Sequence, residues 1–396
     1  MERSGGGSWC RRGCRAPLIP QLAVLAIVVA CAGPLPPAVP APPVPTAAPV
    51  ANQLPGMPPV LDAQNIYSAA GATMLSDAAK AATPRVYVPH TKSGEVWVID
   101  PATFTVVAKH RLGGEIQHVV PSYDMTTLYA TDDRRHKVTP FDPRTGEPGG
   151  SIPVIDPYNM YFTPDGRSAI SVAEARRQLV FYDPHTWQHQ GTLGTPDCAG
   201  IDHADFTADG RTAVFSCEWA GRVAVVDVAS RQLLRMIDMP VRNTKMGPQD
   251  VRLAPDGSVF YIADSQQNGL WVLDGAATTV LRQIPTGHGA HGLYLSRDAT
   301  RLFVTNRHEG SISVLDAYTG AALAKWAVPG GSPDMGNITA DGRQLWLSGR
   351  YDRAVYVLDT ADGRLIHKFD VGRGPHGLCV WPQPGRYSLG HTGITR

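Results

Sequence analysis

Short apolar segments separated by polar turns are the dominant pattern of this chain from residue 84 onward. Within residues 291–328, apolar runs alternate with turns at 297–300, 307–310 and 317–320, and this alternation predicts four strands. Apolar runs that end in aspartate recur every 41 to 47 residues, at Asp100, Asp142, Asp183, Asp227, Asp274, Asp316 and Asp359. Turns of the Asp-Gly type recur in the same phase. Two markers in register predict a repeat fold of seven units.

Four antiparallel strands in about 42 residues are typical of a propeller blade, and seven blades close a ring. We therefore predict an all-β fold, a seven-bladed β-propeller of four-stranded blades. The first unit starts at residues 85–88 without an innermost strand, whereas residues 376–381 form an innermost strand without outer partners. A blade shared by both ends of the chain would close the ring and leave no exposed sheet edge. The long helical patterns of a solenoid are absent from the sequence.

The tetrapeptide at residues 303–306, Phe-Val-Thr-Asn, nearly reproduces the one that names the YVTN β-propeller repeats. Residues 84–396 as a whole resemble YncE-like seven-bladed propellers. Four segments resemble an actinobacterial, extracytoplasmic branch of them, at 156–167, 289–299, 332–342 and 374–393. The resemblance implies fold and location. It implies no single activity, because related propellers include lactonases, haem-type nitrite reductases and plain binding proteins.

Residues 1–30 have the layout of a secretory signal, with three arginines between residues 11 and 15 followed by an apolar run from 18 to 30. The run ends in Val-Val-Ala-Cys, which resembles a bacterial lipobox and would make Cys31 the lipidated N-terminus of a membrane-anchored lipoprotein. A plain signal peptide with an incidental cysteine is the alternative. Both interpretations place the protein outside the cytoplasm, and the first attaches it to the membrane through the lipid alone.

The rest of the chain divides by composition into three parts. Residues 31–60 are a linker rich in Pro and Ala, which is stiff and extended. Residues 61–83 are a lead-in segment, either a short helix or an extended path along the body. Residues 84–396 are the propeller with a short C-terminal tail. The balance of 36 Lys and Arg against 35 Asp and Glu argues against a nucleic-acid partner.

Polar residues gather where the chain enters each innermost strand, and the repeat phase brings these positions to one channel mouth. This ring comprises His118, Asn159, Asp202, His203, Asp250, His291, Asp334 and His376. The turns between second and third strands lie on the same face and add the rim residues His90, Glu174, Glu218 and Asp264. Imidazole and carboxylate groups are ligands of divalent metal ions, so we predict a ligand or metal site here.

Three interpretations of this ring stay open. The polar residues could only line a water-filled channel, or they could bind a small ligand or an extracytoplasmic protein. They could also hold the metal of an enzyme, either a lactonase-like hydrolase or a redox protein. Residue by residue, this ring matches neither the metal site of lactonase-type propellers nor that of redox propellers. We predict a binding protein, with the metal-dependent enzyme as the alternative.

Three cysteines lie in the propeller. Cys198 precedes an innermost strand and Cys217 ends the next strand, so the hairpin between them brings the two close together. In an oxidising compartment a disulfide is the expected outcome, with two thiolate metal ligands as the alternative. Cys379 lies in the closing strand and is expected to be a buried free thiol.

Overall fold

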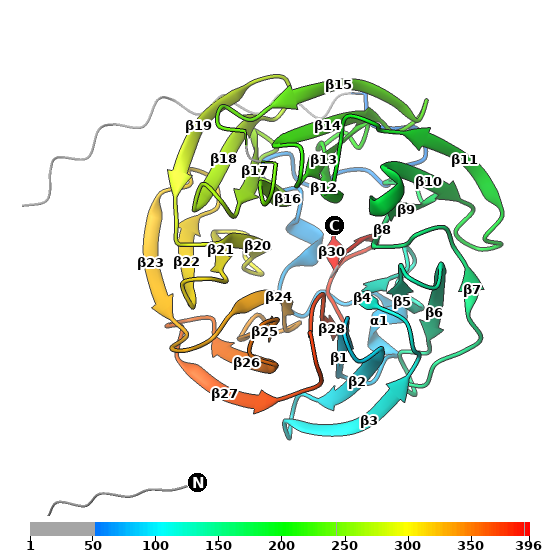
Figure 1. Ribbon diagram of the computed structural model, residues 1–396, viewed down its shortest axis with the longest axis vertical. Coiled ribbons are helices and arrows are strands. Elements are labelled where there is room, and N and C mark those ends of the chain that lie inside the picture. Colours follow the sequence, from blue (N-terminus) through cyan, green and yellow to red (C-terminus); the bar gives the residue numbers. More distant parts are fainter. Residues whose placement is uncertain (1–51, 243, 392) are drawn as a thin grey trace, which may run out of the picture. The chain divides into compact units, whose positions relative to one another are not determined.

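The computed structural model describes residues 52–396, apart from residues 243 and 392, and places them in a ring of seven sheets (Figure 1). Six sheets have four strands and one has six. The chain is therefore the predicted all-β, seven-bladed propeller. The expected lipidation site, Cys31, lies outside the described residues.

The blades are numbered along the chain. Blade 1 contains β1 (Arg85–His90), β2 (Glu95–Asp100), β3 (Thr105–Arg111) and β28 (Cys379–Trp381). Blade 2 contains β4 (Ile116–Pro121), β5 (Leu128–Asp132), β6 (Lys137–Phe141) and β7 (Ile152–Pro153). Blade 3 contains β8 (Asn159–Phe162), β9 (Ala169–Ala173), β10 (Gln178–Tyr182) and β11 (His189–Gly194), with β29 (Ser388–Gly390) and β30 (Ile394–Thr395) added. A short helix, η2 (Glu174–Arg176), follows β9.

The remaining four blades are regular. Blade 4 contains β12 (Ile201–Phe206), β13 (Thr212–Cys217), β14 (Arg222–Asp227) and β15 (Gln232–Asp238). Blade 5 contains β16 (Pro248–Leu253), β17 (Val259–Asp264), β18 (Gly269–Asp274) and β19 (Val280–Pro285). Blade 6 contains β20 (Ala290–Leu295), β21 (Arg301–Asn306), β22 (Ser311–Asp316) and β23 (Ala322–Ala327). Blade 7 contains β24 (Pro333–Ile338), β25 (Gln344–Gly349), β26 (Ala354–Asp359) and β27 (Leu365–Asp370).

Burial follows the position of a strand in its blade. Innermost strands such as β4 are buried at every residue, because they face the channel on one side and other blades on the other. Outermost strands such as β3 alternate between exposed and half-buried residues, the pattern of a strand with one face toward solvent. The closing blade forms as predicted, since β28 pairs antiparallel with β1 and places Cys379 opposite Tyr87.

Both sequence markers, the Asp-Gly turn and the aspartate that ends the third strand, lie in turns where the aspartate side chain accepts the hydrogen bonds. In the Asp-Gly turn of blade 4, Thr207 Oγ1 donates to Asp209 Oδ1 over 2.6 Å, and the amide of Arg211 donates to the same oxygen. The aspartates that end third strands accept backbone amides of the following turn, as Asp227 Oδ1 does from Ser230. These local bonds explain why the two markers recur once per blade.

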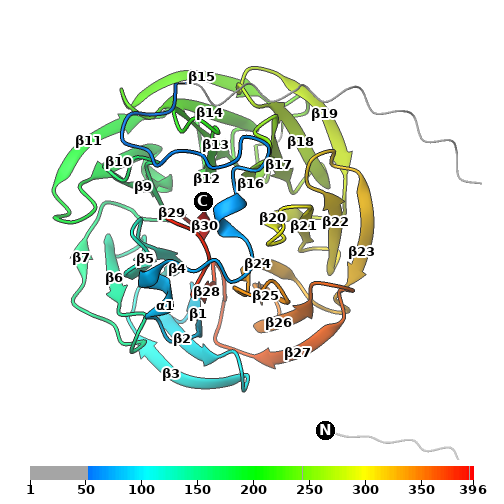
Figure 2. The ribbon, with the colours of Figure 1, turned by 180° about the vertical axis from the view of Figure 1, so that it is seen from behind.

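The N-terminal segment, residues 52–83, crosses one face of the ring (Figure 2). Its helices are short, η1 (Ser68–Ala70) and α1 (Asp77–Lys80), and most of it lies extended along the body. Leu54 and Met57 are buried, so the packed body begins before residue 60, the predicted end of the linker. Among the described residues, no helix has the length and apolar character needed to cross a membrane.

This segment binds the ends of the strands that carry the Asp-Gly turns. Backbone amides of Leu54, Ile66 and Thr73 donate to the carbonyl oxygens of Asp209, Pro255 and Ala340, each over 2.8 Å. The turns between second and third strands lie at the opposite ends of the strands. The face predicted to hold the site is therefore the one that this segment leaves uncovered.

The C-terminal segment, residues 382–396, runs into the channel (Figure 1). Its strand β29 pairs with the innermost strand β8, with Gly390 opposite Tyr161, and this extends blade 3 inward. The sequence predicted only a short tail here. The segment lies outside the seven repeats, so the repeat phase carries no information about its position.

The cysteines are arranged as the hairpin argument expected. Cys198 and Cys217 form a disulfide, with their Cα atoms 4.9 Å apart. Cys379 is a buried free thiol, and burial raises its pKa. The thiolate-ligand alternative for Cys198 and Cys217 is therefore wrong in this structure.

Candidate functional site

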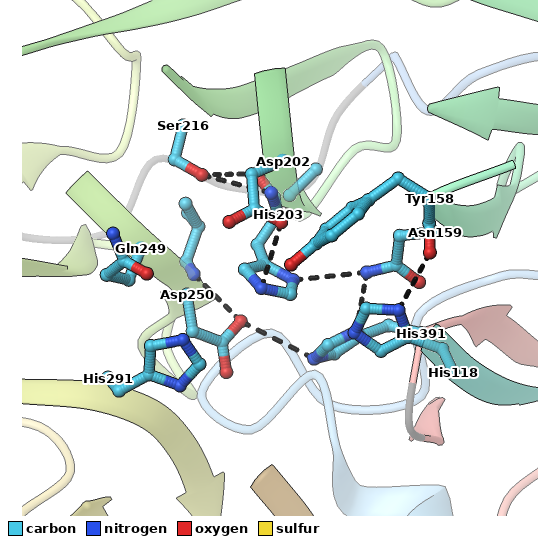
Figure 3. A network of polar contacts seen from close by, with 12 residues as sticks. His118, Tyr158, Asn159, Asp202, His203, Ser216, Gln249, Asp250, His291 and His391 are labelled. Atoms are coloured by element: carbon cyan, nitrogen blue, oxygen red, sulfur yellow. Dashed lines mark hydrogen bonds and ion pairs between the residues drawn. The ribbon is translucent and has the colours of Figure 1, made fainter. Parts of the chain in front are cut away.

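Five buried histidines meet in the channel, and Figure 3 labels His118, His203, His291 and His391. Four come from the predicted ring, His118, His203, His291 and His376, and the fifth, His391, comes from the C-terminal segment. The ring centroids of His203 and His391 are 4.7 Å apart, and those of His118 and His376 are 4.8 Å apart. His118 lies 5.6 Å from both His203 and His391.

A recurring β-bulge turns the polar side chains into the channel. In β12 the register against β13 shifts between Ile201 and Ala204, which leaves Asp202 and His203 in the bulge. The same shift occurs at the start of β4, β16, β20 and β24. A hydroxyl of the second strand supports the bulge, as Ser216 Oγ accepts the amide of His203 over 3.0 Å.

Three of the histidines, His118, His203 and His391, form a candidate metal site. Each offers one ligand nitrogen, and the three nitrogens lie within 4.8 Å of one another. Their Nδ1 atoms are engaged: His118 Nδ1 lies 2.8 Å from the carbonyl oxygen of Tyr158, and Asn159 Nδ2 donates to both His203 Nδ1 (3.1 Å) and His391 Nδ1 (2.9 Å). The buried Nε2 atoms of His118 and His391 have no hydrogen-bond partner among the described residues, whereas His203 Nε2 is paired with Asp202.

Two carboxylates lie beside the Nε2 atoms of His203 and His391. Asp202 Oδ1 is 3.0 Å from His203 Nε2, and Asp250 Oδ1 is 3.7 Å from His391 Nε2. Burial and the neighbouring imidazoles lower the pKa of His118 well below its usual value, and burial also lowers the pKa of His391. Burial alone would lower the pKa of His203, but Asp202, Asp250 and Glu218 together raise it above its usual value. Neutral imidazoles keep a lone pair for a metal ion.

The other predicted histidines, His291 and His376, belong to a second group around Asp334. His376 Nδ1 lies 2.8 Å from Asp334 Oδ2, and His291 Nδ1 lies 3.2 Å from Asp334 Oδ1. Two arginines share this carboxylate, with Arg307 Nη1 at 3.3 Å and Arg350 Nη1 at 3.8 Å. These neighbours together lower the pKa of Asp334, although burial alone would raise it. The predicted single ring is therefore two groups.

Two predicted rim residues are explained by folding alone. His90 is buried against Trp97, with the ring centroids 5.2 Å apart, and its Nδ1 lies 3.3 Å from the carbonyl oxygen of Glu95. Asp264 accepts two turn amides and the Nε1–H of Trp271 over 2.9 Å. Glu174 and Glu218, in contrast, stand half-buried at the channel mouth.

Sequence reasoning missed His391, Arg307 and Arg350. A signal for His391 exists, because it stands beside a glycine, as His291 and His376 do in Gly-Ala-His-Gly (289–292) and Gly-Pro-His-Gly (374–377). Nothing in the sequence pairs Arg307 or Arg350 with Asp334. These contacts depend on how blades 6 and 7 meet.

Comparisons with known proteins agree on the fold. No curated protein matches the sequence. A Desulfotomaculum acetoxidans protein of unknown function is 14% identical with a TM-score of 0.61, over 76% of this chain and 100% of its own. Hydrazine synthase of Kuenenia stuttgartiensis is 18% identical with a TM-score of 0.56, over 66% of this chain and 88% of its own. A Bacteroides uniformis protein provisionally named a 6-phosphogluconolactonase is 18% identical with a TM-score of 0.57, over 74% and 98%.

At these identities the three likenesses show the fold alone, and the three proteins carry different descriptions. A sequence comparison adds a family resemblance. Residues 241–384 match the family model described as YNCE-like beta-propeller, and they span blades 5 to 7 and the closing strand β28. The chain is therefore a seven-bladed β-propeller in which this stretch, over a third of the length, is YncE-like.

Proposed function

We propose that this chain is an extracytoplasmic, lipid-anchored binding protein that holds a divalent transition-metal ion in its channel through His118, His203 and His391. The observation that carries the metal site is the convergence of three buried imidazoles, each of which brings one ring nitrogen within 4.8 Å of the other two. His118 Nδ1 lies against the Tyr158 carbonyl oxygen, so its buried Nε2 keeps a lone pair without a hydrogen-bond partner among the described residues. Such an atom is costly, and a bound ion would satisfy it. The signal-like residues 1–30, Cys31 and the Cys198–Cys217 disulfide support the location.

The groups around the imidazoles suit a metal ion. The Tyr158 carbonyl orients His118 through Nδ1, as outer partners of metal-bound histidines commonly do. The Asn159 amide nitrogen reaches Nδ1 of both His203 and His391, and its oxygen accepts the backbone amide of Met160 over 2.8 Å. The Nε2 atoms of both rings therefore carry protons in this arrangement and face Asp202 and Asp250. An ion bound through these Nε2 atoms would replace both protons. Asp202 and Asp250 would offset the charge of the ion.

The enclosure of the site favours binding over catalysis. The three imidazoles are fully buried, whereas a catalytic metal keeps a coordination position open to substrate. Imidazole ligands suit zinc, copper, nickel or iron. Because His391 comes from the C-terminal segment, an ion here would also fix that segment in the channel. A hydrolase or a redox enzyme would need substrate to reach the ion.

The test is a metal titration of protein purified without a histidine tag and stripped of metal. We expect Co²⁺ and Zn²⁺ to bind with a stoichiometry of one and to compete with each other. His391→Ala should weaken Co²⁺ binding at least tenfold, whereas His189→Ala, on the exposed face of β11, should not. Wild-type binding by both His391→Ala and His203→Ala, with folding checked by circular dichroism, would overturn the proposal.

A further inference from the structure

We propose that the channel mouth binds a small zwitterion, an amino acid or short peptide, with its carboxylate against Arg307 and Arg350 and its ammonium group against Asp133, Glu174 and Glu218. The inference rests on the proposed binding face, but it does not require the metal ion. It gives a role to the charged residues at the channel mouth, which the proposed histidine site does not involve.

The five charged residues occupy one structural position, the first residue after the second strand of the four-stranded repeat. Blades 2, 3 and 4 carry an acid there, whereas blades 6 and 7 carry an arginine. The acids are Asp133, Glu174 and Glu218, and the bases are Arg307 and Arg350. Thr91 and Ser265 occupy the same position in blades 1 and 5 and separate the two halves. Consecutive blades are neighbours in the ring, so the mouth has an acidic side and a basic side.

The acidic side has few donors for its charge. Asp202 is only 1% exposed, and its close partner is a single imidazole nitrogen, His203 Nε2, 3.0 Å from Oδ1. Asp133 Oδ2 accepts a hydrogen bond from Gln117 Nε2, but its Oδ1 has no partner among the described residues. After burial, Asp202 is the largest influence that raises the pKa of both Glu174 and Glu218. Arg177, which lies on the same rim, donates instead to the carbonyl oxygen of Pro196 over 3.1 Å. An ammonium group would supply the missing donors.

The basic side has the opposite imbalance. Arg307 and Arg350 both form their ion pairs with Asp334, so two guanidinium groups share one carboxylate. Arg307 is 6% exposed, and its Nε has no hydrogen-bond partner among the described residues. Arg350 is half-buried and reaches Asp334 only at 3.8 Å. Guanidinium groups bind carboxylates in a planar, two-pronged geometry, so this side fits a second carboxylate.

Tyr158 and two exposed aromatic residues complete the mouth. Burial raises the pKa of Tyr158, Asp202 and Glu174 raise it further, and Arg350 lowers it, so groups of both sides act on this one hydroxyl. Trp219 and Tyr351, which follow Glu218 and Arg350 directly, are 43% and 57% exposed. An aromatic face beside each charged side favours a ligand with an organic body over a pair of simple ions.

The test is isothermal titration calorimetry of the metal-free protein with triglycine. Two analogues each remove one charge, N-acetyltriglycine the ammonium group and triglycine amide the carboxylate. We expect triglycine to bind and each analogue to bind at least tenfold more weakly. Glu218→Gln should weaken triglycine but not N-acetyltriglycine, and Arg350→Gln should weaken triglycine but not triglycine amide. The matched controls are Asp197→Asn and Arg353→Gln, both at exposed positions.

Absence of triglycine binding, equal binding of the blocked analogues, or equal effects of the control substitutions would each overturn the proposal. The analogues test it on the wild-type protein, so the result does not depend on a variant that folds poorly. His391→Ala should keep triglycine binding, which separates a failure of this proposal from a failure of the metal site.

Discussion

Replacing Arg396 with methionine should unfold the protein more easily, because this side chain anchors the C-terminal segment inside the ring. Arg396 is 1% exposed, and its Nη2 donates to Asp205 Oδ1 over 2.9 Å and to the carbonyl oxygen of Phe206 over 2.7 Å. Its Nη1 donates to the carbonyl oxygen of Thr207 over 3.2 Å. Methionine keeps much of the apolar stem but removes every donor.

The magnitude follows from what Asp205 retains. Removing one partner of a buried ion pair costs about 3–5 kcal/mol, since the other charge stays buried. Asp205 still accepts the hydroxyl of Tyr67 over 3.1 Å and the amides of Leu253 and Phe206. We therefore expect the lower end, about 3 kcal/mol. For a domain of this size that loss lowers Tm by about 4 °C.

The assay is urea unfolding followed by tryptophan fluorescence, with Arg386→Met as the control. Arg386 lies in the same segment and is exposed, with one hydrogen bond to the carbonyl oxygen of Pro59. Adding Asp205→Asn to Arg396→Met should restore part of the lost stability, because the unpaired carboxylate is then gone. Equal stability of Arg396→Met and the wild type, or no recovery in the double variant, would refute the anchoring role.

Three further outcomes are expected. Cys31→Ser should move the protein from the membrane to the soluble fraction, and a wild type that is already soluble without its first 31 residues would contradict the anchor. Replacing Cys198 and Cys217 with alanine should cost about 3 kcal/mol in urea unfolding, with no change on adding reductant to the variant. Burial lowers the pKa of His90 from 6.5 to about 4. As the pH falls through this range, His90 is protonated in the unfolded chain before it is protonated in the folded one. The free energy of unfolding should therefore fall by about 3 kcal/mol between pH 6.5 and pH 4. His90→Phe should flatten that part of the stability profile, and an unchanged slope would refute the assignment.

The blades could be predicted from sequence because each repeat carries its own local bonds. An aspartate that holds a turn, such as Asp209, acts through neighbours two residues away, so its spacing is visible in the sequence. The same phase placed His118, His203, Asp202 and Asp250 at one level of the channel. That part of the candidate site follows from the repeat alone.

The remainder of the site depends on contacts that no repeat encodes. His391 enters the channel on a segment that follows the seven repeats. Its neighbour Gly390 pairs with Tyr161, a residue far away in the sequence. Asp334 pairs with His376 and with Arg307, which come from blades on either side of its own. No pattern in a single sequence links these residues to one another, because they come into contact only when the ring has closed.

The position of the C-terminal segment has a consequence for the order of assembly. His391 follows β28, the strand that closes the ring, so it is the last of the channel histidines to leave the ribosome and to cross any membrane. His118 and His203 can be in place before it arrives, but the three-histidine set cannot. If the proposed metal site exists, it is complete only in the compartment where the C-terminal segment folds into the channel. The ion that it binds would then come from the metals available in that compartment.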